Sequence, residues 1–179
     1  MQERYGSVAG GFRRRLDGVL PDGWSSPTPC TDWTVRDLVA HVLGVHRRVV
    51  ATVEGHEPVG VDPEGDLAAQ WRDASQAVIE AVADDIRAAT TVGGMFGEQS
   101  FESLVSRLLC ADTLLHTWDL ARATGQDELL DPDAVAKALL FLTPIDDALR
   151  RPGGFAAAID PPQGADEQTR LLNFCGRAV

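Results

Sequence analysis

The sequence has little positive charge, few cysteines and no long hydrophobic run. Its 16 lysine and arginine residues stand against 27 aspartate and glutamate residues, which gives a net charge of −11. Such a chain repels nucleic-acid phosphates and anionic lipid, so neither nucleic acid nor a membrane is an expected partner. No stretch approaches the roughly 18 apolar residues of a membrane span, and the first residues lack the apolar core of a signal peptide. We therefore expect a cytoplasmic protein.

The three cysteines do not suggest a disulfide framework or a zinc ribbon. Cys30, Cys110 and Cys175 are odd in number, widely separated and free of any CxxC pair, so we expect three reduced thiols. Cys30 lies near a predicted helix start, where a thiolate is stabilised, although packing is the favoured interpretation. Cys110 is expected to face away from Asp112. The sequence also has no GxSxG elbow, glycine-rich phosphate loop or HExxH motif.

Helical periodicity dominates the chain, which predicts an all-α protein with no convincing sheet. With 179 residues, 44% of them hydrophobic, the chain is long enough to bury a substantial core, and we expect one domain over residues 1–179. Gly and Pro clusters divide it into helical segments, with residues 152–162 extended before the last short helix. The predicted helices cover residues 2–19, 34–53, 66–90, 101–124, 131–150 and 167–175.

The second predicted helix has the clearest start. Thr34 can cap it, Asp37 stands at the third helical position, and Trp33 can pack onto Leu38, as in a capping box with a hydrophobic staple. This assignment places His41 two turns into the helix.

Three polar side chains interrupt apolar helical stripes. His41 shares its stripe with Leu38 and Val45, and Asp112 and His116 stand one turn apart on a later helix. Residues four apart lie on one helical face, and two imidazoles with a carboxylate are ligands for a divalent cation. Three protein ligands would leave coordination positions open for water or substrate. The alternative is that both histidines are hydrogen-bonded core residues and that Asp112 is buried beside an arginine.

Nearby polar residues have less direct roles. Asp119, one turn beyond His116, is a candidate to orient that ligand by a hydrogen bond, or to balance the charge of Arg122. His46 lies about 140° around the helix from His41, so we expect it to be exposed. His56 lies in a loop and is expected to be solvated.

Two long motifs resemble the actinobacterial metal-binding branch of the DinB-like superfamily, which is related to the N-terminal domain of mycothiol-dependent maleylpyruvate isomerase. They are PTPCTDWTVRDLVAHVLG at residues 27–44 and DTLLHTWDLARATGQ at residues 112–126, joined by RLLNFCGR at residues 170–177. The resemblance covers most of the chain.

The resemblance implies an up-and-down four-helix bundle with long crossover loops, to which the sequence adds a short C-terminal helix. It places the metal ligands at His41, Asp112 and His116. Glutamate often occupies the position of Asp112 in the isomerase relatives, and the aspartate side chain of this sequence is one methylene shorter than glutamate. Those isomerases also carry a C-terminal domain that completes their thiol site. This chain is expected to be too short to contain it, so maleylpyruvate isomerisation is not transferred.

Two functional hypotheses follow. The first is a divalent-metal-dependent enzyme that uses a low-molecular-weight thiol, mycothiol, in S-transfer or isomerisation of a small electrophile. Zinc suits this chemistry best, whereas Ni²⁺ and Fe²⁺ stay open. No catalytic acid or base can be named. The second hypothesis is a non-catalytic metal- or small-ligand-binding bundle. Related bundles often pair, which leaves a homodimer open.

Overall fold

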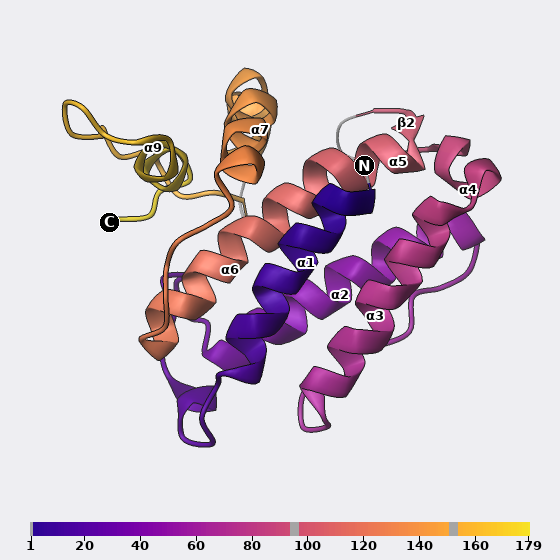
Figure 1. Ribbon diagram of the computed structural model, residues 1–179, viewed down its shortest axis with the longest axis horizontal. Helices are drawn as coiled ribbons and strands as arrows, with labels where there is room; N and C mark the ends of the chain where they lie inside the picture. The colour runs from indigo at the N-terminus through magenta and orange to yellow at the C-terminus, as the bar shows by residue number, and fades with distance from the viewer. Residues whose placement is uncertain (1, 94–96, 151–153) are drawn as a thin grey trace. The chain divides into compact units, whose positions relative to one another are not determined.

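The computed structural model describes residues 2–93, 97–150 and 154–179, and these fall into two compact units, 1–129 and 130–179 (Figure 1). The described residues are mostly helical, which confirms the predicted all-α class. The prediction that residues 1–179 make a single domain stays a prediction.

Four helices form a bundle in the first unit. They are α1 (Gln2–Asp17), α2 (Val35–Glu54), α3 (Leu67–Ala83) and α6 (Cys110–Thr124). Helix α1 packs against α3 and α6, and α2 packs against the same two helices, so α1 and α2 lie on opposite corners (Figure 1). The connection from 18 to 34 therefore crosses the bundle, as the predicted long crossover loops require.

The bundle encloses one hydrophobic core. Each helix contributes apolar residues at a spacing of three or four, which places them on one face. Two large aromatic side chains, Phe12 and Trp71, pack together at a centroid distance of 4.6 Å. The largest fully buried side chains of this core are Trp71, Tyr5, Phe12, Phe101, Leu38, Leu43, Leu109 and Leu120.

The predicted helix ends are confirmed at several positions. Thr34 and Asp37 form the expected capping box at the start of α2, where the Asp37 amide donates to Thr34 Oγ1 and Asp37 Oδ2 accepts from the Thr34 amide. Asp66 caps α3 by accepting a hydrogen bond from the Ala69 amide. Gly125 ends α6 with a φ of 65°, in the left-handed region that favours glycine.

The third predicted helix is shorter than expected. It was predicted to reach residue 90, but α3 ends at Ala83 and a separate short helix, α4 (Asp85–Ala89), follows. Asp84 causes the break, because its extended backbone lets the carboxylate accept from the amides of Ile86 and Arg87.

A small hairpin, which the sequence analysis did not find, precedes the fourth predicted helix. Strands β1 (Thr91–Val92) and β2 (Gln99–Ser100) pair antiparallel. Each strand has only two residues, too few to show alternating hydrophobicity.

The fourth predicted helix, 101–124, contains a change of helical pitch. It begins as α5 (Phe101–Leu104), passes through a π-helical turn at Val105–Leu109 and continues as α6. A π turn holds one more residue than an α turn and therefore shifts the side chains that follow around the helix axis. This shift occurs immediately before the turn that carries Asp112.

The second unit contains α7 (Pro132–Leu142), a 3₁₀ turn at Thr143–Ile145, α8 (Asp146–Leu149) and α9 (Glu167–Phe174). Pro132 begins α7, and Pro144 lies in the turn that ends this helix. Helix α7 packs against α9, the predicted short C-terminal helix. In the segment predicted to be extended, residues 152 and 153 lie outside the described residues, and 154–162 form neither helix nor strand.

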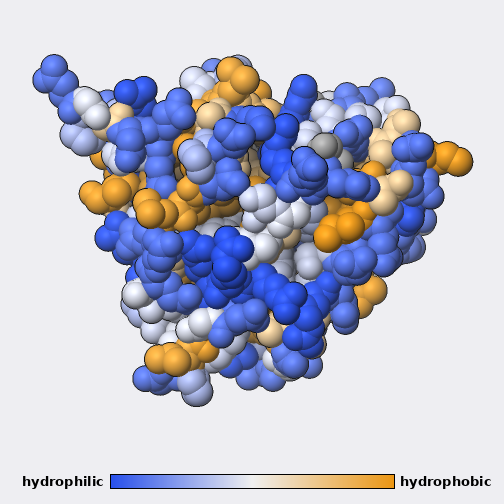
Figure 2. Space-filling model, viewed as in Figure 1, coloured by the Kyte–Doolittle hydropathy of each residue, from blue (hydrophilic) through white to orange (hydrophobic). Residues whose placement is uncertain are grey.

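No helix among the described residues has the length and apolar character needed to cross a membrane. Figure 2 shows a largely hydrophilic face with a hollow of intermediate hydropathy near its middle. A hollow between α1 and α3 is lined by residues of both helices, among them Gly6, Gly10, Trp71 and Gln76. None of the predicted metal ligands lines it.

Candidate metal centre

Two segments of the bundle bring the polar residues together. Helix α2 carries His41, and α6 carries Asp112, His116 and Asp119. Because these helices pack against each other, residues separated by about seventy positions in the sequence meet at one place. The arrangement agrees with metal sites in helical bundles, where facing helices each contribute inward side chains.

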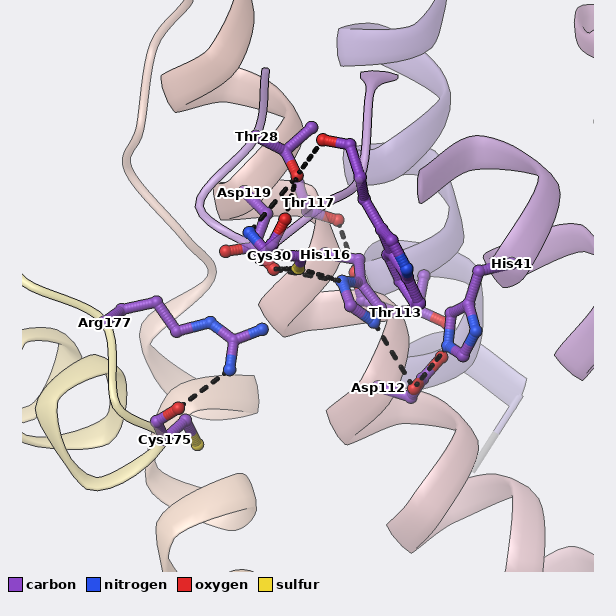
Figure 3. A network of polar contacts seen from close by, with 11 residues as sticks. Thr28, Cys30, His41, Asp112, Thr113, His116, Thr117, Asp119, Cys175 and Arg177 are labelled. Carbon is purple, nitrogen blue, oxygen red and sulfur yellow. Dashed lines mark hydrogen bonds and ion pairs between the residues drawn. The ribbon is translucent and has the colours of Figure 1, made fainter. Parts of the chain in front are cut away.

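His41, Asp112 and His116 converge on one point (Figure 3). Asp112 Oδ1 lies 3.5 Å from His41 Nε2 and 3.6 Å from His116 Nε2. The side chain of His116 is 9% exposed, whereas those of Asp112 and His41 are 22% and 30% exposed. The cluster is thus closed on the His116 side and reachable from solvent on the His41 side.

The distances in this cluster fit metal coordination better than direct hydrogen bonding. Nitrogen–oxygen hydrogen bonds usually span about 2.7–3.2 Å, and both separations are longer. Two ligand atoms at about 2.1 Å from a tetrahedral metal are themselves about 3.4 Å apart. In addition, Asp112 Oδ2 is buried and has no hydrogen-bond partner among the described residues. A cation would satisfy this carboxylate, so the residues present fit a divalent metal.

The opposite edge of the His116 ring meets a second set of polar groups (Figure 3). His116 Nδ1 lies 3.0 Å from Asp119 Oδ2. The Cys30 thiol donates to the same oxygen at 3.3 Å, and Cys30 Sγ lies 3.8 Å from His116 Nδ1. Asp119 is fully buried, so its carboxyl group depends on partners of this kind. Of the two roles predicted for Asp119, this geometry matches orientation of His116, since Arg122 instead pairs with Glu128 at 3.0 Å.

A tight loop, residues 28–33, places the Cys30 side chain beside α6. The Thr28 amide donates to the Trp33 carbonyl at 3.0 Å and the Trp33 amide to the Cys30 carbonyl at 3.1 Å, which folds the chain back on itself. Thr28 Oγ1 accepts from the Cys30 amide at 3.2 Å. Asp32 adopts a φ of 66° within the same turn. The loop then runs directly into the capping box of α2.

In the absence of metal, charge interactions shift the pKa values of His116 and Asp112. Burial lowers the pKa of His116, but the negative charge of Asp112 and the hydrogen bonds with Asp119 and Cys30 outweigh it and raise this pKa to about 10. Burial raises the pKa of Asp112, yet the charge of His116 and the contact with His41 lower it overall. The metal-free cluster is therefore an imidazolium beside a carboxylate, and cation binding must displace a proton from His116.

The ring of Trp33 packs beside both histidines of the cluster. Its ring centroid lies 4.7 Å from that of His41 and 6.0 Å from that of His116. The two imidazoles themselves meet edge to face at 5.0 Å. These contacts limit how far either ring can rotate, so they help to keep the nitrogen atoms aimed at Asp112.

The prediction that His46 is exposed is wrong. Its side chain is fully buried, with ring centroids 4.7 Å from Trp71 and 5.9 Å from Tyr5. Helix α2 packs against both α3 and α6, so its buried arc is wider than the stripe that contains His41. Nδ1 of His46 lies 2.8 Å from the Val42 carbonyl, and burial lowers the pKa of His46 to about 4. His46 is thus a neutral core residue.

The predictions for His56 and Cys110 are confirmed. His56 is exposed and its Nε2 lies 2.8 Å from a Glu54 carboxylate oxygen. Cys110 is buried outside the cluster, and burial raises the pKa of its thiol to about 11. No disulfide joins Cys30, Cys110 or Cys175 in the described part of the chain.

Sequence reasoning missed the contact of Cys30 with the cluster and the position of Trp33 beside it. Both residues lie in the 27–44 motif that also contains His41, and this shared motif was the available signal. Helical periodicity could not reveal the contacts, because Cys30 and Trp33 precede the helix.

Comparisons with known proteins place this cluster in context. Residues 7–121 match the family model described as the mycothiol maleylpyruvate isomerase N-terminal domain. The uncharacterized proteins MT0763 and Rv0738, from the CDC 1551 / Oshkosh and H37Rv strains of Mycobacterium tuberculosis, are each 34% identical over 177 residues. These alignments cover 94% of this chain and 92% of each relative. No solved structure matches the chain significantly.

Proposed function

Because the chain belongs to the family of the mycothiol maleylpyruvate isomerase N-terminal domain, we propose that it is a metal-dependent enzyme that uses mycothiol. The reaction is S-transfer to a small electrophile, or its isomerisation, in the cytoplasm. The observation that carries this proposal is the convergence of His41, Asp112 and His116, whose ligand atoms lie within 4.8 Å of one another.

The three residues would hold the metal through two imidazole nitrogens and one carboxylate. This set suits Zn²⁺, and Ni²⁺ and Fe²⁺ accept the same ligands. A metal bound there lowers the pKa of a coordinated thiol, which supplies a thiolate at neutral pH. Three protein ligands leave a coordination position open for such a thiol.

The surrounding residues hold the ligands in place. Asp119 accepts a hydrogen bond from His116 Nδ1, which directs Nε2 toward Asp112. Such contacts fix both the tautomer and the orientation of a ligating histidine. The Trp33 ring packs against that of His41 with 42° between the ring planes. His41 and Asp112 remain partly exposed and present the face that a thiol would approach.

The test combines metal analysis with thiol binding, on protein purified without a histidine tag. We expect about one zinc per chain and calorimetric binding of mycothiol to the zinc-loaded protein. His116→Ala should lose both, because it removes one of three ligands. His56→Ala is the matched control, since His56 is an exposed loop histidine, and it should keep both.

Two results would overturn this proposal in different ways. Unchanged zinc content in both His41→Ala and His116→Ala would reject the ligand assignment. A zinc-loaded protein that binds no mycothiol and conjugates no electrophile would instead support the non-catalytic metal-binding bundle. If the chain forms a homodimer, sedimentation of the zinc-loaded protein will give twice the monomer mass.

A further inference from the structure

We propose that Cys30, Asp119 and the Nδ1 atom of His116 form a second cation site, which takes thiophilic divalent metals. It uses the opposite edge of the same imidazole that faces Asp112 (Figure 3). This site does not depend on the proposed thiol chemistry, because every ligand comes from the chain itself.

The three ligand atoms already stand close to a tetrahedral arrangement. Cys30 Sγ lies 3.3 Å from Asp119 Oδ2 and 3.8 Å from His116 Nδ1, and the nitrogen lies 3.0 Å from the oxygen. Zinc bonds of about 2.3 Å to sulfur and about 2.1 Å to nitrogen and oxygen would separate these atoms by roughly 3.4–3.6 Å. Each separation therefore needs to change by only a few tenths of an ångström.

A regular helix and a hydrogen-bonded loop position the three ligands. His116 and Asp119 stand three residues apart on α6 and share one face of the helix. Cys30 is held by the loop in which Thr28 Oγ1 accepts from the Cys30 amide. Asp119 and His116 are both buried, whereas Cys30 is half-buried. A cation would reach the site from the sulfur side and find the other two ligands already in position.

The two ligand sets differ in chemical softness. His41, Asp112 and His116 offer only nitrogen and oxygen, whereas the second set includes a thiolate, the ligand that soft metals prefer. Binding at the second set displaces the protons of Cys30 Sγ and His116 Nδ1 to solvent, and nothing is oxidised or reduced. The remaining proton of His116 then lies on Nε2, where it blocks coordination with His41 and Asp112. A thiophilic metal at the second set should therefore expel the metal at the first.

Cadmium is a suitable probe, because a cadmium–thiolate bond gives an ultraviolet charge-transfer band. Titration of the full chain with Cd²⁺ should produce this band and saturate at one equivalent. Cys30→Ser should abolish the band, whereas Cys110→Ser, the control at a buried thiol away from the cluster, should keep it. Asp119→Asn should weaken cadmium binding by about tenfold or more. Circular dichroism of each variant checks that it is folded.

A second measurement separates the two ligand sets. His41→Ala should keep the cadmium–thiolate band, because His41 belongs only to the nitrogen and oxygen set. Cys30→Ser should still bind zinc through that first set. In wild-type protein loaded with Co²⁺, added Cd²⁺ should remove the visible cobalt spectrum.

The proposal is overturned if cadmium gives no thiolate band, or if the band persists in Cys30→Ser. It is also overturned if Cys30→Ser loses zinc, since Cys30 would then belong to a single site. Retained cobalt after one equivalent of cadmium would contradict the mutual exclusion. Different results would contradict the proposed function. These are a zinc-loaded wild-type protein that binds no mycothiol, or a zinc content that His41→Ala leaves unchanged.

Discussion

His116 Nδ1 lies 3.0 Å from Asp119 Oδ2, while Nε2 at the other end of the ring faces Asp112 Oδ1 at 3.6 Å. One imidazole thus joins a fully buried carboxyl group to the partly exposed cluster. This relationship directs Nε2 of His116 toward Asp112, and it motivates the first prediction.

Asp119→Asn should lower zinc affinity by about 10- to 100-fold while leaving the three ligands in place. The amide removes the negative charge that holds the Nδ1 proton, so the ring is less well oriented and less basic. Competition with a chromophoric chelator measures the affinity. Asp85→Asn changes an exposed carboxyl on α4 and should have no effect. Equal affinity in the wild type and Asp119→Asn would show that Asp119 does not orient the ligand.

Zinc affinity should rise with pH because His116 must give up a proton. Charge and hydrogen bonding raise the pKa of this residue to about 10 in the metal-free protein, so it is protonated at neutral pH. Loss of one proton on binding makes the apparent affinity rise about tenfold per pH unit until pH approaches that pKa. Calorimetry at pH 8 in buffers of different ionisation enthalpy should give about one proton released from His116. Zero proton release would contradict the ion pair.

The buried His46 should make the protein sensitive to acid. Burial lowers its pKa to about 4, whereas the unfolded chain takes up this proton near pH 6.5. The free energy of unfolding is therefore highest above about pH 6.5. It falls by roughly 3 kcal/mol as the pH is lowered toward 4. His46→Met should flatten this part of the profile measured by urea unfolding. His56→Gln, at an exposed histidine, should retain the slope, and a wild-type profile without it would refute the assignment.

The capping box should contribute measurably to the stability of α2. Thr34→Ala removes the side-chain acceptor for the Asp37 amide and should lower the free energy of unfolding by about 1 kcal/mol. Thr34→Ser keeps the hydroxyl and should stay within a few tenths of a kcal/mol of the wild type. Urea denaturation gives both values. An alanine variant as stable as the serine variant would show that the cap is replaced by solvent.

Local sequence signals predicted most of the bundle. The starts of α2 and α3 and the end of α6 follow from Thr34, Asp66 and Gly125, whose side chains or backbone freedom act within one turn. The break at Asp84 and the π turn at Val105–Leu109 were missed. Asp84 interrupts a region whose apolar spacing continues, and a π turn depends on packing around the helix rather than on any single residue type.

The candidate site was only partly accessible to sequence reasoning. Asp112 and His116 are one turn apart, so their proximity is a local property, whereas the approach of His41 depends on which helices face each other. His46 was misplaced because a single apolar stripe does not describe a helix packed on two sides. The contacts of Cys30 depend on the fold of the 28–33 loop, for which periodicity carries no information.

Anomalous diffraction from crystals of the zinc-loaded protein, recorded on both sides of the zinc absorption edge, tests the central claim most directly. The account predicts one strong peak about 2.0–2.2 Å from His41 Nε2, His116 Nε2 and a carboxylate oxygen of Asp112. A zinc peak bound by other residues, or His41 beyond bonding distance of the zinc, would contradict it.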